Sequence, residues 1–103
     1  MNQDWITALE RLRFDIVRRE PLQGHKEYGG GASAEIFVTD DGQIRLVVAR
    51  MRNESKSEKK KSSAGREYQI FREQNAVTII NYKLRAGEDL GAIVRDMESE
   101  IAA

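Results

Sequence analysis

The chain has 103 residues, with 17 basic and 17 acidic side chains, one histidine and no cysteine. This length fits one hydrophobic core, so we expect residues 1–103 to form a single domain. A net charge of zero excludes a bulk attraction of the whole molecule to nucleic acid or anionic lipid, and the lack of cysteine excludes disulfides and thiolate metal sites.

The first element predicted by the sequence is an amphipathic helix. Apolar residues recur there at helical spacing, with charged residues between them: Trp5, Leu9, Leu12 and Ile16. Pro21 stops this helix by about Glu20, although the run from Phe14 to Val17 would also suit the start of a short strand. Because charged residues interrupt any apolar run within residues 1–20, we expect neither a signal peptide nor a membrane span, and therefore a cytoplasmic protein without a membrane partner.

The next segment, residues 21–33, has the sequence PLQGHKEYGGGAS. Its three consecutive glycines, Gly29 to Gly31, favour a mobile or sharply bent backbone. We therefore expect a flexible loop between the first helix and the strands.

Four β-rich runs follow. AEIFVT and QIRLVVARMR flank Asp40-Asp41-Gly42, which is typical of a hairpin turn, and REYQIFRE and AVTIINYKL indicate a second antiparallel pair. A stripe of apolar residues then predicts a C-terminal helix: Leu90, Ile93, Val94, Met97 and Ile101. The expected fold is α+β in two layers, with an N-terminal helix, a four-stranded antiparallel β-meander and a C-terminal helix.

Residues 53–65, NESKSEKKKSSAG, lie between the two strand pairs and include four lysines and four serines. Such a polar stretch gains little from burial, so we expect a second flexible loop that is exposed to solvent or to a charged partner. Charge is unevenly distributed around it: residues 43–73 carry a net +5, whereas residues 1–42 carry −3 and residues 87–103 carry −4. The middle of the chain is thus basic, unless the acidic ends fold back and neutralise it.

No motif indicates catalysis, a metal or a cofactor. His25 lacks ligands at metal-binding spacing, and the carboxylate pairs Asp40-Asp41 and Glu88-Asp89 are explained by a turn and a helix start. The serines are concentrated in the charged segment, where nothing fixes a catalytic partner. We therefore expect a protein that is not an enzyme and that uses no cofactor.

The function that we predict first is non-catalytic binding of single-stranded or structured nucleic acid, with low sequence specificity. Cationic side chains would hold phosphates, and Tyr68, or else Phe71 or Tyr82, would offer a ring for base stacking. The candidate nucleic-acid-binding residues are Arg50, Arg52, Lys56, Lys59, Lys60, Lys61, Arg66 and Tyr68.

The alternative is a protein-interaction domain, such as an adaptor or inhibitor, that uses an apolar sheet face and binds no nucleic acid. Both faces of the predicted strands carry apolar residues, since Val47 and Met51 alternate with Leu46 and Val48. Long twisted strands can bury different faces at their two ends, or the second face can pair with another subunit. Because small domains with a surplus of apolar sheet surface often dimerise, we expect a homodimer, for the nucleic-acid-binding module as well.

Overall fold

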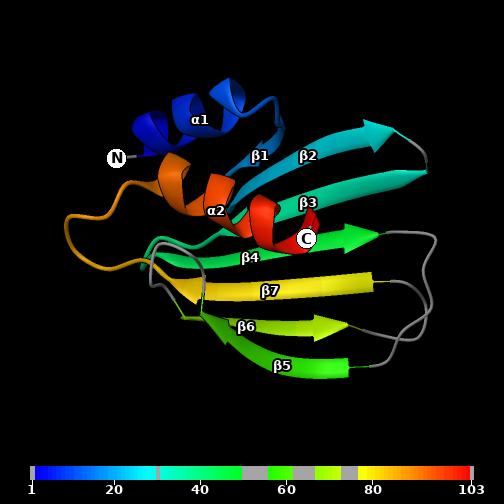
Figure 1. Ribbon diagram of the computed structural model, residues 1–103. Helices are drawn as coiled ribbons and strands as arrows, with labels where there is room; N and C mark the ends of the chain where they lie inside the picture. The colour runs from blue at the N-terminus through cyan, green and yellow to red at the C-terminus, as the bar shows by residue number, and fades with distance from the viewer. Residues whose placement is uncertain (1, 30, 50–55, 62–66, 73–76, 103) are drawn as a thin grey trace.

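The computed structural model of the protein describes residues 2–29, 31–49, 56–61, 67–72 and 77–102. The helices and strands in these ranges are α1 (Asn2–Arg11), β1 (Asp15–Arg19), β2 (Leu22–Gly29), β3 (Ala32–Val38), β4 (Gln43–Ala49), β5 (Lys56–Lys61), β6 (Glu67–Arg72), β7 (Val77–Lys83) and α2 (Leu90–Ala102). Within the described residues, seven strands form one antiparallel sheet in the order β1-β2-β3-β4-β7-β6-β5 (Figure 1). The predicted α+β class with two helices is confirmed, but the four-stranded meander is wrong.

The first helix ends before the limit near Glu20 that Pro21 suggested, because the backbone conformation of Arg13 terminates it. Arg13 has a φ of 73°, in the left-handed region where helices commonly terminate. The N–H of Arg13 donates to the carbonyl of Glu10 at 2.9 Å, and the N–H of Phe14 donates to that of Leu9 at 3.0 Å. This pair of hydrogen bonds is a Schellman motif, and it allows the chain to enter β1 at Asp15.

The segment 21–33 is mostly strand, so the prediction of a flexible loop there is wrong. β2 and β3 occupy most of it, and they pair in antiparallel register from Leu22 with Val38 to Gly29 with Ala32. Gly24 is buried in β2, where an added Cβ would lie 3.1 Å from Ile36. This glycine therefore permits close packing within the sheet rather than a loop.

The predicted hairpin is confirmed. β3 and β4 pair antiparallel, and Gly42 in the connecting turn has a φ of 88°. The pairing of β6 with β7 is also confirmed. The two pairs join differently from a meander, because β4 lies beside β7 and the β5–β6 hairpin is thereby placed at the outer edge.

The expected loop at 53–65 is also wrong in its described part, since residues 56–61 form the edge strand β5. Its backbone pairs with β6 from Lys56 opposite Arg72 to Lys61 opposite Glu67. Lysines are common on edge strands, because their charge discourages pairing with other chains. A lysine-rich segment is thus compatible with a strand at this position.

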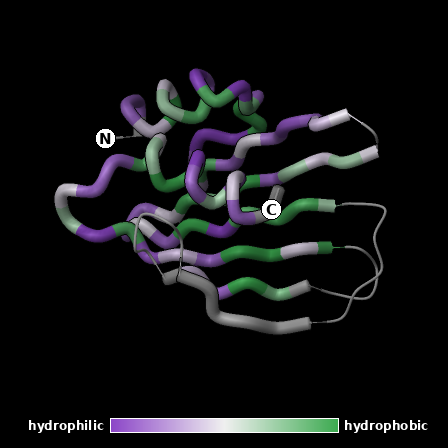
Figure 2. Tube along the Cα trace, viewed as in Figure 1, coloured by the Kyte–Doolittle hydropathy of each residue, from purple (hydrophilic) through white to green (hydrophobic). Residues whose placement is uncertain are grey.

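The hydrophobic core lies between the helices and one face of the sheet. Alternate strand residues point into it, and one fully buried row crosses four strands: Ile36, Leu46, Ile80 and Ile70. Figure 2 shows hydrophobic stretches concentrated in the central strands. α2 buries the predicted stripe from Leu90 to Met97, and the N–H of Ala92 donates to Asp89 Oδ2 at 3.0 Å, so Asp89 caps this helix as expected.

Candidate functional site

Both helices cover the same face of the sheet, which leaves the opposite face as the candidate binding surface (Figure 1). We call this opposite surface the open face. Its described side chains come from the strand positions that alternate with the core: Gln23, His25, Glu35, Phe37, Gln43, Arg45, Val47, Gln69, Phe71, Ile79 and Asn81. Phe37 retains 37% of its surface exposed, so its ring is accessible from the open face.

The structure places four of the seven basic residues that were predicted to bind nucleic acid. Lys56, Lys59, Lys60 and Lys61 all belong to β5, at the edge of the sheet. The other three cations, Arg50, Arg52 and Arg66, lie outside the described residues. The lysines therefore line up along one strand that is continuous with the sheet, instead of projecting on a separate loop.

Tyr68 does not belong to an exposed site, which corrects the prediction that its ring stacks on bases. It is fully buried on the helix side of β6 and meets the ring of Tyr82 edge-on, with the ring centroids 5.2 Å apart. Its hydroxyl donates to Asp96 Oδ2 of α2 at 2.6 Å. Tyr82 is also buried and donates to Glu88 at 2.9 Å, so Tyr68 fastens α2 to the sheet and Tyr82 fastens the segment that precedes α2.

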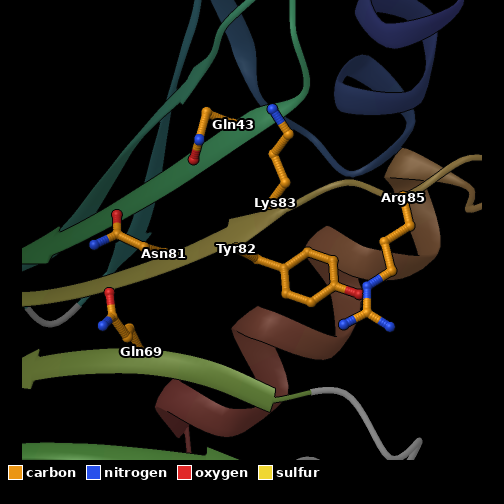
Figure 3. A pocket seen from close by; sticks show the side chains of 6 residues that line it. All are labelled: Gln43, Gln69, Asn81, Tyr82, Lys83 and Arg85. Atoms are coloured by element: carbon orange, nitrogen blue, oxygen red, sulfur yellow. The ribbon is translucent and has the colours of Figure 1, made fainter.

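A hollow of about 760 Å³ lies on the open face. Its apolar wall includes Phe37, Val47 and Ile79, and its polar wall includes Arg45, Gln69 and Asn81. A smaller hollow of about 280 Å³ adjoins it, because Gln43, Gln69 and Asn81 line both. Figure 3 shows these three amides on β4, β6 and β7, with Lys83 and Arg85 further along. We call the combined depression the open-face trough.

The sheet register arranges several of these residues in a straight line across the strands. Phe37 of β3 pairs with Arg45 of β4, Arg45 with Asn81 of β7, and Asn81 with Gln69 of β6. Gln69 in turn pairs with Lys59 of β5. We call these five residues the open-face row. It joins an exposed ring, two amides and two cationic residues in one continuous cross-strand sequence.

Arg45 and Asn81 are held together within this row. Arg45 is exposed, and its Nε donates to Asn81 Oδ1 at 3.1 Å. Since the amide oxygen faces the arginine, the amide nitrogen of Asn81 is a donor toward other groups. The remaining guanidinium N–H groups of Arg45 are suited to an anion, because arginine presents five donors in a planar fork.

Beside the row, His25 bridges two carboxylates. Its Nδ1 is 2.5 Å from Glu35 Oε1, and its Nε2 is 2.6 Å from Glu27 Oε2. Hydrogen bonds to Glu35 first, and then to Glu27, raise the pKa of His25 above its ordinary 6.5. Gln23 Nε2 also donates to Glu35, at 3.2 Å. The negative charge of Glu35 is thus engaged by its neighbours on β2.

The acidic C-terminal part of the chain does not fold over the open face. Lys26 and Tyr28 of β2 bind Glu98 of α2, at 2.8 and 2.6 Å, and Lys26 also lies 4.9 Å from the centre of the Phe14 ring. Together with the tyrosine contacts to Asp96 of α2 and to Glu88 before it, these bonds hold three carboxylates on the helix-covered side. The described contacts of this part of the chain therefore lie on the helix-covered side of the sheet.

Other kinds of site are not indicated by the described part of the chain. Among those residues, no three or more histidine, aspartate or glutamate side chains come together as metal ligands. Asp41 belongs to the β3–β4 turn, where hydrogen bonds from Thr39 and then Lys83 lower the pKa of its carboxyl. No described helix combines the length and apolar character that crossing a membrane requires.

Comparisons with protein-family models, with curated proteins and with solved structures found no match.

Sequence reasoning identified the lysines of β5 but missed the polar part of the open face, namely Arg45, Gln69 and Asn81. Their signal is the alternation of each strand, since each occupies a position between two buried apolar residues.

Proposed function

We propose that this chain is a non-catalytic nucleic-acid-binding module that holds single-stranded or structured nucleic acid with low sequence specificity. The observation that carries the proposal is the position of β5. Lys56 and Lys59 to Lys61 occupy an edge strand whose backbone pairs with β6, so four cationic residues lie along one edge of the sheet, and Lys59 shares the register position of Gln69 on the open face. Phosphates contribute most of the affinity in complexes of low specificity, and lysines at an edge suit that role.

The remaining chemistry of the open face supports the same proposal. Phe37 offers a partly exposed ring, while Gln43, Gln69 and Asn81 offer amides that both donate and accept hydrogen bonds. Such groups contact bases without requiring one base in particular. The proposal places the protein in the cytoplasm, with Arg50, Arg52 and Arg66 as further phosphate contacts.

The test is fluorescence anisotropy with labelled single-stranded DNA, duplex DNA and RNA over a range of salt concentrations. Replacing Lys59, Lys60 and Lys61 together by glutamine should weaken binding and lower the slope of log affinity against log salt by about 2 to 3, since each lost phosphate contact removes roughly 0.7 to 0.9. The matched control replaces Arg11, Arg18 and Arg95, which are exposed on α1, β1 and α2, by glutamine. It removes the same charge elsewhere and should leave the slope unchanged. Equal slopes for the two triple variants would contradict the proposal.

A second function is favoured by the apolar part of the open face. Val47, Phe71 and Ile79 occupy neighbouring strands in one cross-strand row and are only half-buried, as a protein-binding or dimer surface requires. We propose, as the alternative, an adaptor or inhibitor domain that pairs through this face, including as a homodimer. Val47→Asp should then abolish association in sedimentation velocity. Met51, which the same hypothesis involves, lies outside the described residues.

A further inference from the structure

We infer that the open-face row is the path of an unpaired stretch of nucleic acid, which runs across the strands from Phe37 to Lys59 and places one base in the open-face trough. This inference rests on the proposed function and makes its ligand more specific. It predicts that the open face selects single strands over duplexes, a preference that phosphate contacts by β5 alone would not produce.

The ring at one end of the row supplies the first reason. Phe37 is 37% exposed, and its neighbours in the hollow, Val47 and Ile79, extend an apolar floor beside it. An unpaired base stacks on such a ring through its flat face, which is worth about 1 to 3 kcal/mol per base. The bases of a duplex are already stacked on each other, so a duplex cannot use this surface without unpairing.

The amides in the middle of the row supply the second reason. Asn81 and Gln69 pair across β7 and β6, and both line the hollow, so they meet the edge of any base that lies against its apolar floor. Arg45 orients Asn81 by the 3.1 Å hydrogen bond to its amide oxygen. Amides of this kind hydrogen-bond to the edges of all bases, which agrees with low sequence specificity.

The charge along the row supplies the third reason. Arg45 is exposed next to Phe37, and Lys59 occupies the far end of the row. Lys59 lies four strand spacings from Phe37, a distance of roughly 19 Å at about 4.8 Å per spacing. The span suits a few nucleotides of a backbone that crosses the strands. Among the described residues that line the two hollows there is no carboxylate, and the nearby Glu35 is engaged by His25 and Gln23.

The experiment compares the affinities of wild-type protein for a labelled single-stranded oligonucleotide and for the same strand annealed to its complement. Phe37→Leu removes the ring but keeps an apolar side chain, and Arg45→Gln removes an exposed charge. Each should weaken single-strand binding at least about five-fold and leave duplex binding nearly unchanged. Arg95→Gln, the same chemical change on α2, is the control and should bind as the wild type does. Circular dichroism and thermal melting check that each variant folds.

Four results would overturn the inference. The first is that single strand and duplex bind alike, and the second is that Phe37→Leu binds single strand as tightly as the wild type. If the Lys59/Lys60/Lys61 variant still loses affinity in either case, only the inference fails and the proposed function stands. If the wild type binds no nucleic acid even at low salt, both fail. If the protein instead sediments as a dimer that Val47→Asp dissociates and that excludes oligonucleotide, a second copy occupies the face.

Discussion

The hydroxyl of Tyr68, a fully buried residue of β6, donates a hydrogen bond of 2.6 Å to Asp96 of α2. This bond connects the outer part of the sheet to the C-terminal helix, far from β1 and α1 in the strand order. It places the aromatic ring and a carboxylate on the helix-covered side, so neither is available to a ligand on the open face.

Tyr68→Phe should lower the free energy of unfolding by about 1.5 to 3 kcal/mol, because it removes a buried hydrogen bond to a charged group while keeping the ring. Tyr28→Phe is the matched control, since the Tyr28 hydroxyl donates to Glu98 at the same distance of 2.6 Å but from a side chain that is exposed. Its loss should cost less than about 1 kcal/mol. Urea denaturation measures both, and equal losses would show that burial does not strengthen the Tyr68 bond.

The parts of the fold that were predictable from the sequence are those determined by local pattern. The Asp40-Asp41-Gly42 turn and the alternating strands around it predicted the β3–β4 hairpin, and the apolar stripe predicted α2. The polar strands β2 and β5 were missed because their strand conformation depends on backbone pairing with neighbouring strands rather than on apolar composition. β2 carries Gly24 and Lys26 at positions that face the core, and β5 carries no apolar residue, so neither shows the usual strand pattern.

The candidate site was predictable only in its charged component. Four lysines within residues 56–61 predicted a cationic site, but on a loop, and the sequence does not state which strand lies beside this segment. The pairing of β4 with β7 joins residues about 36 positions apart, such as Arg45 and Asn81, and this non-local contact creates the open-face row. Tyr68 was assigned to the site because its face of the sheet depends on the position of α2, which the strand pattern alone does not fix.

His25 should titrate above its ordinary pKa and make stability depend on pH. Its pKa is raised by Glu35 and Glu27 in the folded protein, so the imidazolium stabilises the fold at pH values below the unfolded pKa of about 6.5. That contribution is lost as the pH rises through the raised pKa of the folded state. The free energy of unfolding should therefore fall as the pH rises from below 6.5 through the raised pKa of the folded state.

The measurement for His25 is direct because the chain has a single histidine, whose ring proton resonances are unambiguous in an NMR titration. Glu35→Gln should move the pKa of His25 back toward 6.5 and flatten the pH dependence of stability, since Glu35 is the largest cause of the shift. Glu10→Gln, on the exposed surface of α1, should change neither. An unshifted pKa in the wild type would mean that the two carboxylate contacts do not persist in solution.

Arg13 closes α1 in a backbone conformation that suits glycine better than arginine. Its φ of 73° brings a Cβ toward the following carbonyl, at a cost of about 1 to 2 kcal/mol for a side-chain-bearing residue. Glycine avoids this cost but gains conformational freedom in the unfolded chain, which offsets about 0.4 to 1 kcal/mol. Arg13→Gly should therefore raise the free energy of unfolding by about 0.5 to 1 kcal/mol, a gain that urea denaturation resolves.

Arg11→Gly is the matched control for this prediction, because Arg11 is exposed and lies within the last turn of α1. Glycine inside a helix costs about 1 kcal/mol, so this variant should be less stable than the wild type although the same side chain is removed. Opposite signs for two identical substitutions two residues apart would locate the helix end at the Schellman motif. If both substitutions destabilise the protein, α1 continues through Arg13 in solution and the approach of the chain to β1 differs from that described here.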